Sequence, residues 1–186
     1  MLPTVLTLRG WRIFVLGRGR AAVRRLLQAE EAGAEDITIF SPDADDHLKA
    51  HAKDRLRERW PQETEWESAR LAFIAGESEA VSATLAEAAG RHRLLVNVED
   101  RPALCDFYMP SVLRRGDLML AVSTGGAAPA LGQVVIADLG RRYGPEWAER
   151  SAEVASLRRE WKAAGHDMAA VAEKTKAYLK EKGWLS

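Results

Sequence analysis

The chain has 186 residues, of which 47% are hydrophobic, so it is long enough for one domain with a real core and an appendage. Lys and Arg together number 27, as do Asp and Glu, and the formal net charge is therefore zero. This balance argues against a protein that binds nucleic acid or a membrane surface through bulk charge. A single cysteine, Cys105, excludes an internal disulfide and fits a reducing compartment.

The first residues, MLPTVLTLRGWRIF, lack the basic segment followed by a long apolar run that marks a signal peptide. No apolar run reaches the length of a transmembrane helix. We therefore expect a cytoplasmic protein without a membrane partner.

The first half of the chain reads as a strand, a turn, a helix and a second strand. The apolar run Trp11–Gly17 predicts a strand buried on both faces. Arg20–Ala32 is rich in helix formers, and Ala22, Val23, Leu26 and Leu27 are expected to share its buried face. Asp36–Asp43 predicts a second strand that ends in a Ser-Pro turn.

Further strands and helices alternate along the chain. Asp45–Arg59 is charged and predicts a solvated helix, and Ser78–His92 predicts a second, amphipathic one. The remaining predicted strands are Arg70–Glu77, Leu94–Asp100 and Asp117–Gly126. This alternation indicates an α/β fold, a Rossmann-like parallel sheet with right-handed crossovers. After Gly140 the pattern changes to two amphipathic helices, which pack on this chain or on a partner subunit.

The turn after the first strand, VLGRGRAA, matches the pattern G-x-G-x-x-A at Gly17, Gly19 and Ala22. In dinucleotide-binding folds the first glycine allows the tight turn, the second admits a pyrophosphate, and the small third residue lets helix and strand pack closely. The motif alone favours a cofactor site and a plain tight turn about equally. The acidic residue expected at the end of the second strand is absent there, and Ser41 and Asp43 are the candidates for its role.

A set of motifs spread over residues 1–145 resembles the precorrin-2 dehydrogenase / sirohydrochlorin ferrochelatase family, which includes the N-terminal part of sirohaem synthases. Besides the glycine turn, the motifs are P-x-x-x-x-L-x-G (Pro3, Leu8, Gly10), NV-x-D-x-P (Asn97, Val98, Asp100, Pro102), F-x-x-P (Phe107, Pro110) and S-T-G-G-x-x-P (Ser123, Thr124, Gly125, Gly126, Pro129).

The resemblance implies NAD-dependent oxidation of precorrin-2 to sirohydrochlorin, with insertion of ferrous iron in some members. It places the catalytic aspartate on Asp100, just past a strand, where ligands of open α/β sheets bind. From the residues alone, Asp100 would be read as a turn or cap residue before Pro102. The resemblance implies substrate contacts at Phe107, Ser123, Thr124, Gly125 and Gly126. The cofactor-binding residues that it implies are Gly17, Arg18, Gly19, Arg20, Ala21, Ala22, Ser41, Pro42, Asp43, Ala75, Gly76, Asn97 and Val98.

Three residues depart from the family pattern. Arg18 stands where the family has a third glycine in the turn, Gly76 replaces a threonine and Ser82 replaces an asparagine. Because these positions surround the cofactor, two further hypotheses remain: a member that only inserts metal, and a non-catalytic sensor of a tetrapyrrole or nucleotide. NAD titration combined with a turnover assay separates the three.

We expect a dinucleotide-binding domain at 1–109, a dimerisation segment at 110–140 and a small helical domain at 141–186. The expected partners are the tetrapyrrole substrate, ferrous iron as a possible second substrate, and a second copy of the chain in a homodimer. The scattered histidines and the lone cysteine predict no metal site.

Overall fold

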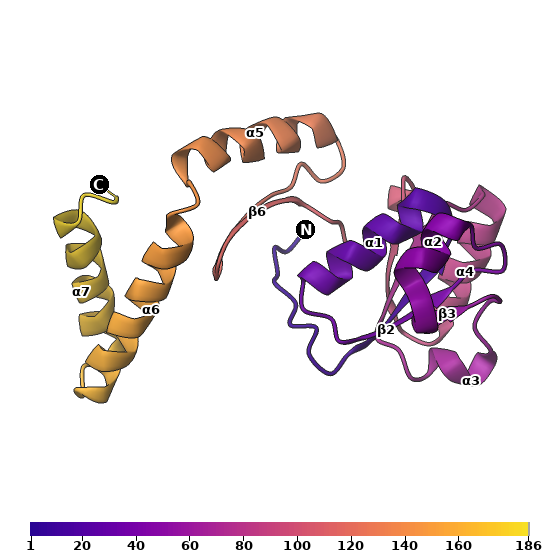
Figure 1. The fold of residues 1–186 in the computed structure, drawn as a ribbon, viewed down its shortest axis with the longest axis horizontal. Coiled ribbons are helices and arrows are strands. Elements are labelled where there is room, and N and C mark those ends of the chain that lie inside the picture. Colours follow the sequence, from indigo (N-terminus) through magenta and orange to yellow (C-terminus); the bar gives the residue numbers. More distant parts are fainter. Residues whose placement is uncertain (186) are drawn as a thin grey trace. The chain divides into compact units, whose positions relative to one another are not determined.

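A five-stranded parallel sheet forms the first of two compact units (Figure 1). In the computed structural model, which describes residues 1–185, this unit spans Met1–Tyr108 and the second begins at Met109. The sheet order is β3-β2-β1-β4-β5, so that the chain winds outward in both directions from β1 and β4. The strands are β1 (Arg12–Gly17), β2 (Asp36–Phe40), β3 (Leu56–Arg57), β4 (Leu71–Ala75) and β5 (Leu95–Val98). The predicted Rossmann-like α/β fold is confirmed.

Helices cover both faces of this sheet. They are α1 (Gly19–Glu31), α2 (Asp46–Ala52), α3 (Glu63–Trp66) and α4 (Glu79–Arg91), with short 3-10 turns η1 (Lys53–Arg55) and η2 (Pro102–Leu104). The alternation of β1 decides which side chains face which layer. Ile13 and Val15 pack into one apolar cluster with α1 and α2, while Phe14 and Leu16 pack into a second cluster with α3 and α4. Both faces of β1 are therefore buried, which explains why its sequence is continuously apolar.

Two predicted elements and one predicted helix face are wrong. Asp45–Arg59 is not one solvated helix, because its second half supplies the edge strand β3 and Leu48 of α2 is fully buried. Asp117–Gly126 does not join the parallel sheet; it contains β7 (Leu118–Val122), which pairs antiparallel with β6 (Ser111–Arg115). Leu27 is 48% exposed, since the buried stripe of α1 runs through Leu26 to Ala29 instead.

The second unit consists of the β6–β7 hairpin and three helices (Figure 1). The helices are α5 (Pro129–Arg142), α6 (Trp147–Ala163) and α7 (Met168–Glu181). Helices α6 and α7 pack on each other, with Val171 fully buried and the Arg150 guanidinium 5.3 Å and 5.0 Å from the ring centroids of Trp147 and Trp184. The two C-terminal helices therefore bury some of their apolar side chains against each other, although the apolar residues of α6 do not gather on one face as predicted.

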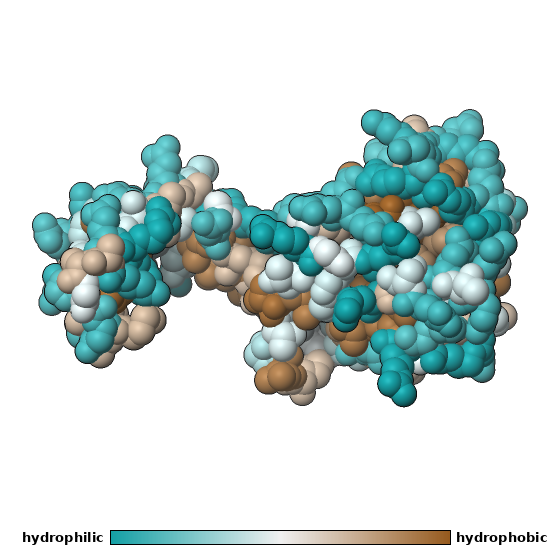
Figure 2. All heavy atoms as spheres, turned by 90° about the horizontal axis from the view of Figure 1, so that it is seen from below, coloured by the Kyte–Doolittle hydropathy of each residue, from teal (hydrophilic) through white to brown (hydrophobic). Residues whose placement is uncertain are grey.

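The surface in Figure 2 is mainly hydrophilic, with apolar residues exposed between the polar ones. In the second unit, the large apolar side chains that remain exposed are Met109, Val112, Leu131, Val134, Met168 and Leu185. None of the helices within residues 1–185 combines the length and the apolar character needed to cross a bilayer.

An ion pair on the first unit ties the segment after β3 to α3. The Glu65 carboxylate accepts hydrogen bonds from Arg59 Nη1 and Nη2 at 2.6 and 2.9 Å, and from the Gln62 backbone N–H at 2.7 Å. The hydrogen bonds from Arg59 lower the pKa of Glu65 from 4.5 to about 2. Because the folded-state pKa lies below the unfolded one, this pair stabilises the fold above about pH 4.5, and its contribution is lost as the pH falls towards 2.

We predict that Arg59→Gln lowers the urea midpoint of unfolding at pH 7, and that its difference from the wild-type protein shrinks as the pH falls through this window. Urea titrations between pH 7 and pH 3 measure the effect. Arg141→Gln is the control, since its pair with Asp138 has exposed fractions of 73% and 53% and contributes little. A difference that stays constant with pH contradicts the role of the Glu65 carboxylate.

Candidate functional site

The glycine turn lies at the carboxyl end of β1, the central strand of the sheet, and is locked against β4. Gly17 has φ +140°, and a Cβ built on it would stand 1.8 Å from the Ala75 carbonyl oxygen. The Arg18 backbone N–H donates to this same oxygen at 3.2 Å. Any side chain at Gly17 would therefore separate β1 from β4.

The start of α1 is open toward the edge of the sheet. Arg18, the N-cap residue, is extended, and no side chain among residues 1–185 caps this helix end. A Cβ on Gly19, at φ +62°, would have only Asp45 Oδ2 within 4 Å, at 3.8 Å. Ala22 is fully buried against the sheet. An uncapped helix start with free backbone donors and space in front of Gly19 fits the pyrophosphate of a dinucleotide.

The Arg18 side chain forms a two-pronged ion pair with Glu77, which lies between β4 and α4. Arg18 Nε donates to Glu77 Oε1 at 3.0 Å and Nη2 donates to Oε2 at 2.6 Å, while Nη1 lies 3.6 Å from Asp43 Oδ2. The Glu77 side chain is only 2% exposed, compared with 45% for Arg18. The hydrogen bonds and charge of Glu77 raise the pKa of the Arg18 guanidinium.

Gly76 interlocks with the same turn. At φ +75°, a Cβ on Gly76 would lie 2.4 Å from the Arg18 carbonyl oxygen. A threonine at position 76 is incompatible with this backbone, so the departures at positions 18 and 76 belong to one local arrangement. The Gly76 N–H donates to Glu99 Oε2 at 3.2 Å, and Arg24 of α1 pairs with the other oxygen of Glu99. The loops after β1, β4 and β5 are thereby held together.

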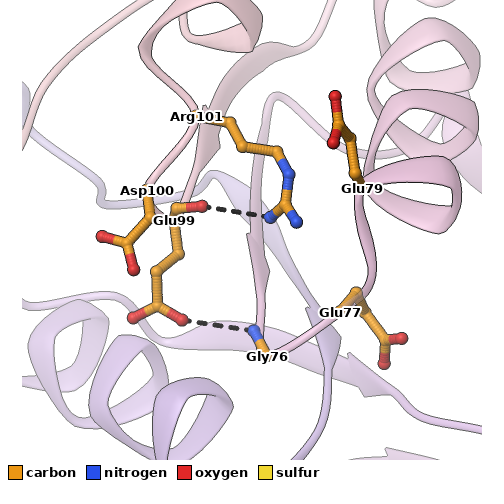
Figure 3. A pocket seen from close by; sticks show the side chains of 6 residues that line it. All are labelled: Gly76, Glu77, Glu79, Glu99, Asp100 and Arg101. Atoms are coloured by element: carbon orange, nitrogen blue, oxygen red, sulfur yellow. Dashed lines mark hydrogen bonds between the residues drawn. The ribbon is translucent and has the colours of Figure 1, made fainter.

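A pocket of about 540 Å³ opens beside these loops at the carboxyl ends of β4 and β5. Its size is in the range of small-molecule sites. Its lining residues are Gly76, Glu77, Glu79, Glu99, Asp100 and Arg101. In Figure 3, Glu99 and Asp100 of the loop after β5 lie on one side. Glu77 of the loop after β4 and Glu79 at the start of α4 lie on the other, and the Arg101 side chain reaches between the two sides. The pocket is therefore rich in carboxylates with one guanidinium in its lining.

Asp100 occupies the third position of a turn in which the Arg101 N–H donates to the Val98 carbonyl at 3.4 Å. Its φ of +56° is uncommon for a residue other than glycine, although Asp and Asn tolerate it. Asp100 is exposed and lines the pocket. The structure therefore presents the Asp100 carboxylate at the edge of the sheet on a strained turn.

The residues just before Asp100 are buried. Asn97 is 4% exposed and donates from Nδ2 to the Phe107 carbonyl at 2.9 Å, while Val98 packs in an apolar cluster. Within the described chain, Asn97 Oδ1 has no hydrogen-bond partner. The Cys105 Sγ accepts from the Val98 N–H at 3.2 Å and donates to backbone carbonyls. Asn97 and Cys105 thus anchor the loop that carries Asp100.

The other predicted cofactor residues lie on the same edge of the sheet. Arg20 and Ala21 form the first turn of α1, and Ala75 is the buried last residue of β4. Ser41 is fully buried after β2, with its Oγ unpartnered among the described residues, while Pro42 and Asp43 are exposed.

The predicted substrate residues are divided between the two units. Phe107 belongs to the first, where its ring lies 5.8 Å from that of Phe73. Ser123–Gly126 belongs to the second, in the loop before α5. There the Ser123 and Thr124 hydroxyls accept hydrogen bonds from the N–H groups of Gly125 and Ala128, both at 3.2 Å.

The sequence analysis missed Glu77, Glu99 and Arg24. The two glutamates could have been found, because each lies at the carboxyl end of a predicted strand, where ligands of parallel sheets bind. Arg24 carried no such signal. No three His, Cys, Asp or Glu side chains within residues 1–185 are grouped to hold a metal ion.

Comparisons with known proteins show which family the chain belongs to and which fold it shares. Residues 4–111 match a family model described as "Putative NAD(P)-binding". The siroheme synthase of Methylococcus capsulatus is 40% identical over 133 residues, which are 70% of this chain and 28% of that protein. The siroheme synthase of Nitrosococcus oceani is 34% identical over 141 residues, or 74% of this chain and 30% of that protein. The chain thus spans less than a third of these relatives.

Among solved structures, the precorrin-2 dehydrogenase SirC has a similar fold. The match has a TM-score of 0.77 and 23% sequence identity, and it covers 100% of this chain and 93% of that one.

We predict that Gly76→Ala destabilises the protein by more than about 2 kcal/mol, because it combines a positive φ with a clash against the Arg18 carbonyl. Gly90→Ala is the control: Gly90 lies within α4 with open space around its Cβ position, so alanine there should stabilise by about 0.5–1 kcal/mol. Chemical unfolding of the three proteins measures both effects. Equal stabilities of the two variants would contradict the interlocked turn.

Proposed function

Because this chain belongs to the NAD(P)-binding family of precorrin-2 dehydrogenases and siroheme synthases, we propose that it oxidises precorrin-2 to sirohydrochlorin with NAD as hydride acceptor. One observation carries the proposal: the open glycine turn and the Asp100 carboxylate lie on the same edge of one sheet, joined by the contacts of Gly76 and Glu99. A hydride acceptor and a proton acceptor are the two groups that this oxidation needs.

Different residues at this edge of the sheet are proposed to bind different parts of the dinucleotide. A bound nicotinamide supplies the hydride acceptor. Gly17 allows the tight turn against β4, Gly19 leaves room for the pyrophosphate, and the start of α1 stabilises the negative charge of the pyrophosphate. Asp43, exposed after β2, is suited to accept hydrogen bonds from ribose hydroxyls, and its charge disfavours a 2′-phosphate. These features favour NAD over NADP.

Asp100 is proposed as the general base. Oxidation of precorrin-2 removes a hydride from one atom of the macrocycle and a proton from another. The exposed carboxylate accepts the proton as the C–H or N–H bond breaks, while the hydride leaves with its electron pair to the nicotinamide. The positive φ turns this carboxylate out from the strand end toward the pocket edge.

We expect Asp100→Asn to reduce turnover on the order of 10²-fold or more, since the amide cannot accept the proton. NAD affinity should remain, because Asp100 is not one of the residues of the glycine turn. Asparagine tolerates positive φ, so the fold should be kept. NADH formation from enzymatically prepared precorrin-2, together with calorimetric NAD titration, measures the two quantities.

Asp100→Gly is the matched control for backbone strain, because glycine relieves the positive φ and also removes the carboxylate. If the carboxylate is the base, the glycine variant is inactive although it is at least as stable as the wild-type protein. If the asparagine variant turns over precorrin-2 at the wild-type rate, Asp100 is not the general base and serves only to form the turn.

The acidic lining of the pocket favours a second activity on the same tetrapyrrole. Glu79 and Asp100 are exposed in this lining, and a carboxylate accepts a proton from a pyrrole nitrogen during metal insertion. We propose ferrous iron as a substrate for this step. Anaerobic mixing of the protein with sirohydrochlorin and ferrous iron, followed by absorption spectroscopy, tests it separately from NADH formation. Iron insertion without NAD binding would favour the metal-inserting hypothesis, and ligand binding without either reaction would favour the sensor.

The proposed dimerisation segment, 110–140, comprises the β6–β7 hairpin and most of α5. Leu131 and Val134 of α5 are 55% and 67% exposed. Neighbouring large apolar side chains exposed on one helix are typical of a surface that binds another protein. The loop Ser123–Gly126 is proposed to bind substrate carboxylates through its backbone N–H groups. A homodimer would cover the apolar face of α5.

We predict that the protein sediments at about twice 20.6 kDa at micromolar concentration. Val134→Glu should shift it toward the monomer, because a charge would be buried at the interface. Gln133→Glu, at a neighbouring exposed position, is the control and should leave the dimer intact. A wild-type monomer across this range contradicts the proposal.

A further inference from the structure

Arg18 spans the carboxyl end of β1 from one neighbouring strand to the other. Its guanidinium reaches Glu77, which follows β4, and Asp43, which follows β2. In doubly wound sheets a dinucleotide follows the same path, with its adenosine ribose beyond the second strand and its pyrophosphate over the first turn. The side chain that departs most from the family pattern therefore lies along the route of the cofactor.

The two contacts of the guanidinium are unequal. Glu77 is 2% exposed and accepts from both Nε and Nη2, at 3.0 and 2.6 Å. Leaving such a carboxylate without its partner is costly, so this contact is expected to persist when a ligand arrives. Asp43 is 76% exposed and lies 3.6 Å from Nη1, which is a weak, solvated contact that a stronger anion can replace.

We propose that Arg18 is a pyrophosphate-binding residue and that Glu77 positions it. The inference rests on the dinucleotide binding proposed above. Glu77 holds the Nε and Nη2 side of the planar guanidinium, which directs the Nη1 donors outward to a phosphate oxygen. The phosphate takes the place of Asp43 at Nη1, and the Asp43 carboxylate then becomes available to the ribose hydroxyls. Arg18 thus serves in place of the glycine of other family members without blocking the site.

The backbone supports this positioning. The carbonyl oxygen of Arg18 packs against Gly76, and the N–H of Arg18 donates to the carbonyl of Ala75. The backbone of Arg18 is therefore held on both sides by the end of β4 and the loop that carries Glu77. The direction of the guanidinium is therefore set by one rigid segment. A lysine has the charge but lacks the planar pair of donors that matches Glu77.

The test is calorimetric titration of the full chain with NAD, ADP and adenosine. We expect Arg18→Gln to weaken NAD and ADP binding on the order of tenfold or more, because a charged contact is lost and Glu77 is left unpaired next to the phosphates. Adenosine, which has no phosphate, should bind as before. Arg18→Lys should lose part of the affinity, and Glu77→Gln should weaken ADP binding severalfold through a less well oriented Arg18.

The double variant Arg18→Gln/Glu77→Gln removes the unpaired buried carboxylate. It protects the test against misfolding of the single variant, and it should bind ADP more tightly than Arg18→Gln alone, a non-additivity expected of residues in direct contact. Arg12→Gln is the matched control: its pair with Asp36 lies at the opposite end of β1, and its side chain has the same 45% exposure. Its ADP affinity should equal that of the wild-type protein.

Two results overturn the inference while leaving the proposed function intact: wild-type ADP affinity in the double variant, or tighter ADP binding by Arg18→Gln, which would make Arg18 an obstruction. Additive effects of Arg18→Gln and Glu77→Gln would also overturn the positioning role of Glu77. A wild-type protein that binds neither NAD, NADP nor ADP overturns the proposed function and this inference together.

Discussion

The site depends on the close approach of two backbone segments, the turn after β1 and the turn after β4. Each segment needs a glycine where the other passes: a Cβ on Gly17 would meet the Ala75 carbonyl, and a Cβ on Gly76 would meet the Arg18 carbonyl. Because the constraint is reciprocal, neither loop can move without the other. The open start of α1, the Arg18 side chain and the Glu77 carboxylate all take their positions from this contact.

The close approach of these two turns also brings arginine and glutamate side chains together as ion pairs. The edge of the sheet gathers several carboxylates, and two arginines of the glycine turn and α1 neutralise the two most buried ones, Glu77 and Glu99. Asp43 and Asp100 remain exposed on either side. The proposed chemistry uses this division: paired carboxylates hold the loops and orient Arg18, while the exposed ones meet ribose hydroxyls and the macrocycle.

The second unit contributes a different kind of surface. Its hairpin and α5 carry partly exposed apolar residues, and its glycine-rich loop is shaped by the hydroxyls of Ser123 and Thr124. The chain spans less than a third of the siroheme synthases that it matches.

The sequence by itself determined the central layer of the fold and the position of the glycine turn. Continuous apolar runs marked β1, β4 and β5 because both faces of these strands are buried, and the glycine spacing marked the start of α1. Such local signals do not report distant partners. Strand β3 has only two residues in a charged segment, and β7 pairs with β6 instead of the parallel sheet; hydrogen bonding to other parts of the chain decides both. The same holds for Arg18 and Glu77, which are 59 positions apart, and for Gly76. Only the tertiary structure brings the ends of β1 and β4 into contact, and that proximity joins two departures from the family pattern, Arg18 and Gly76, in one interlocked site.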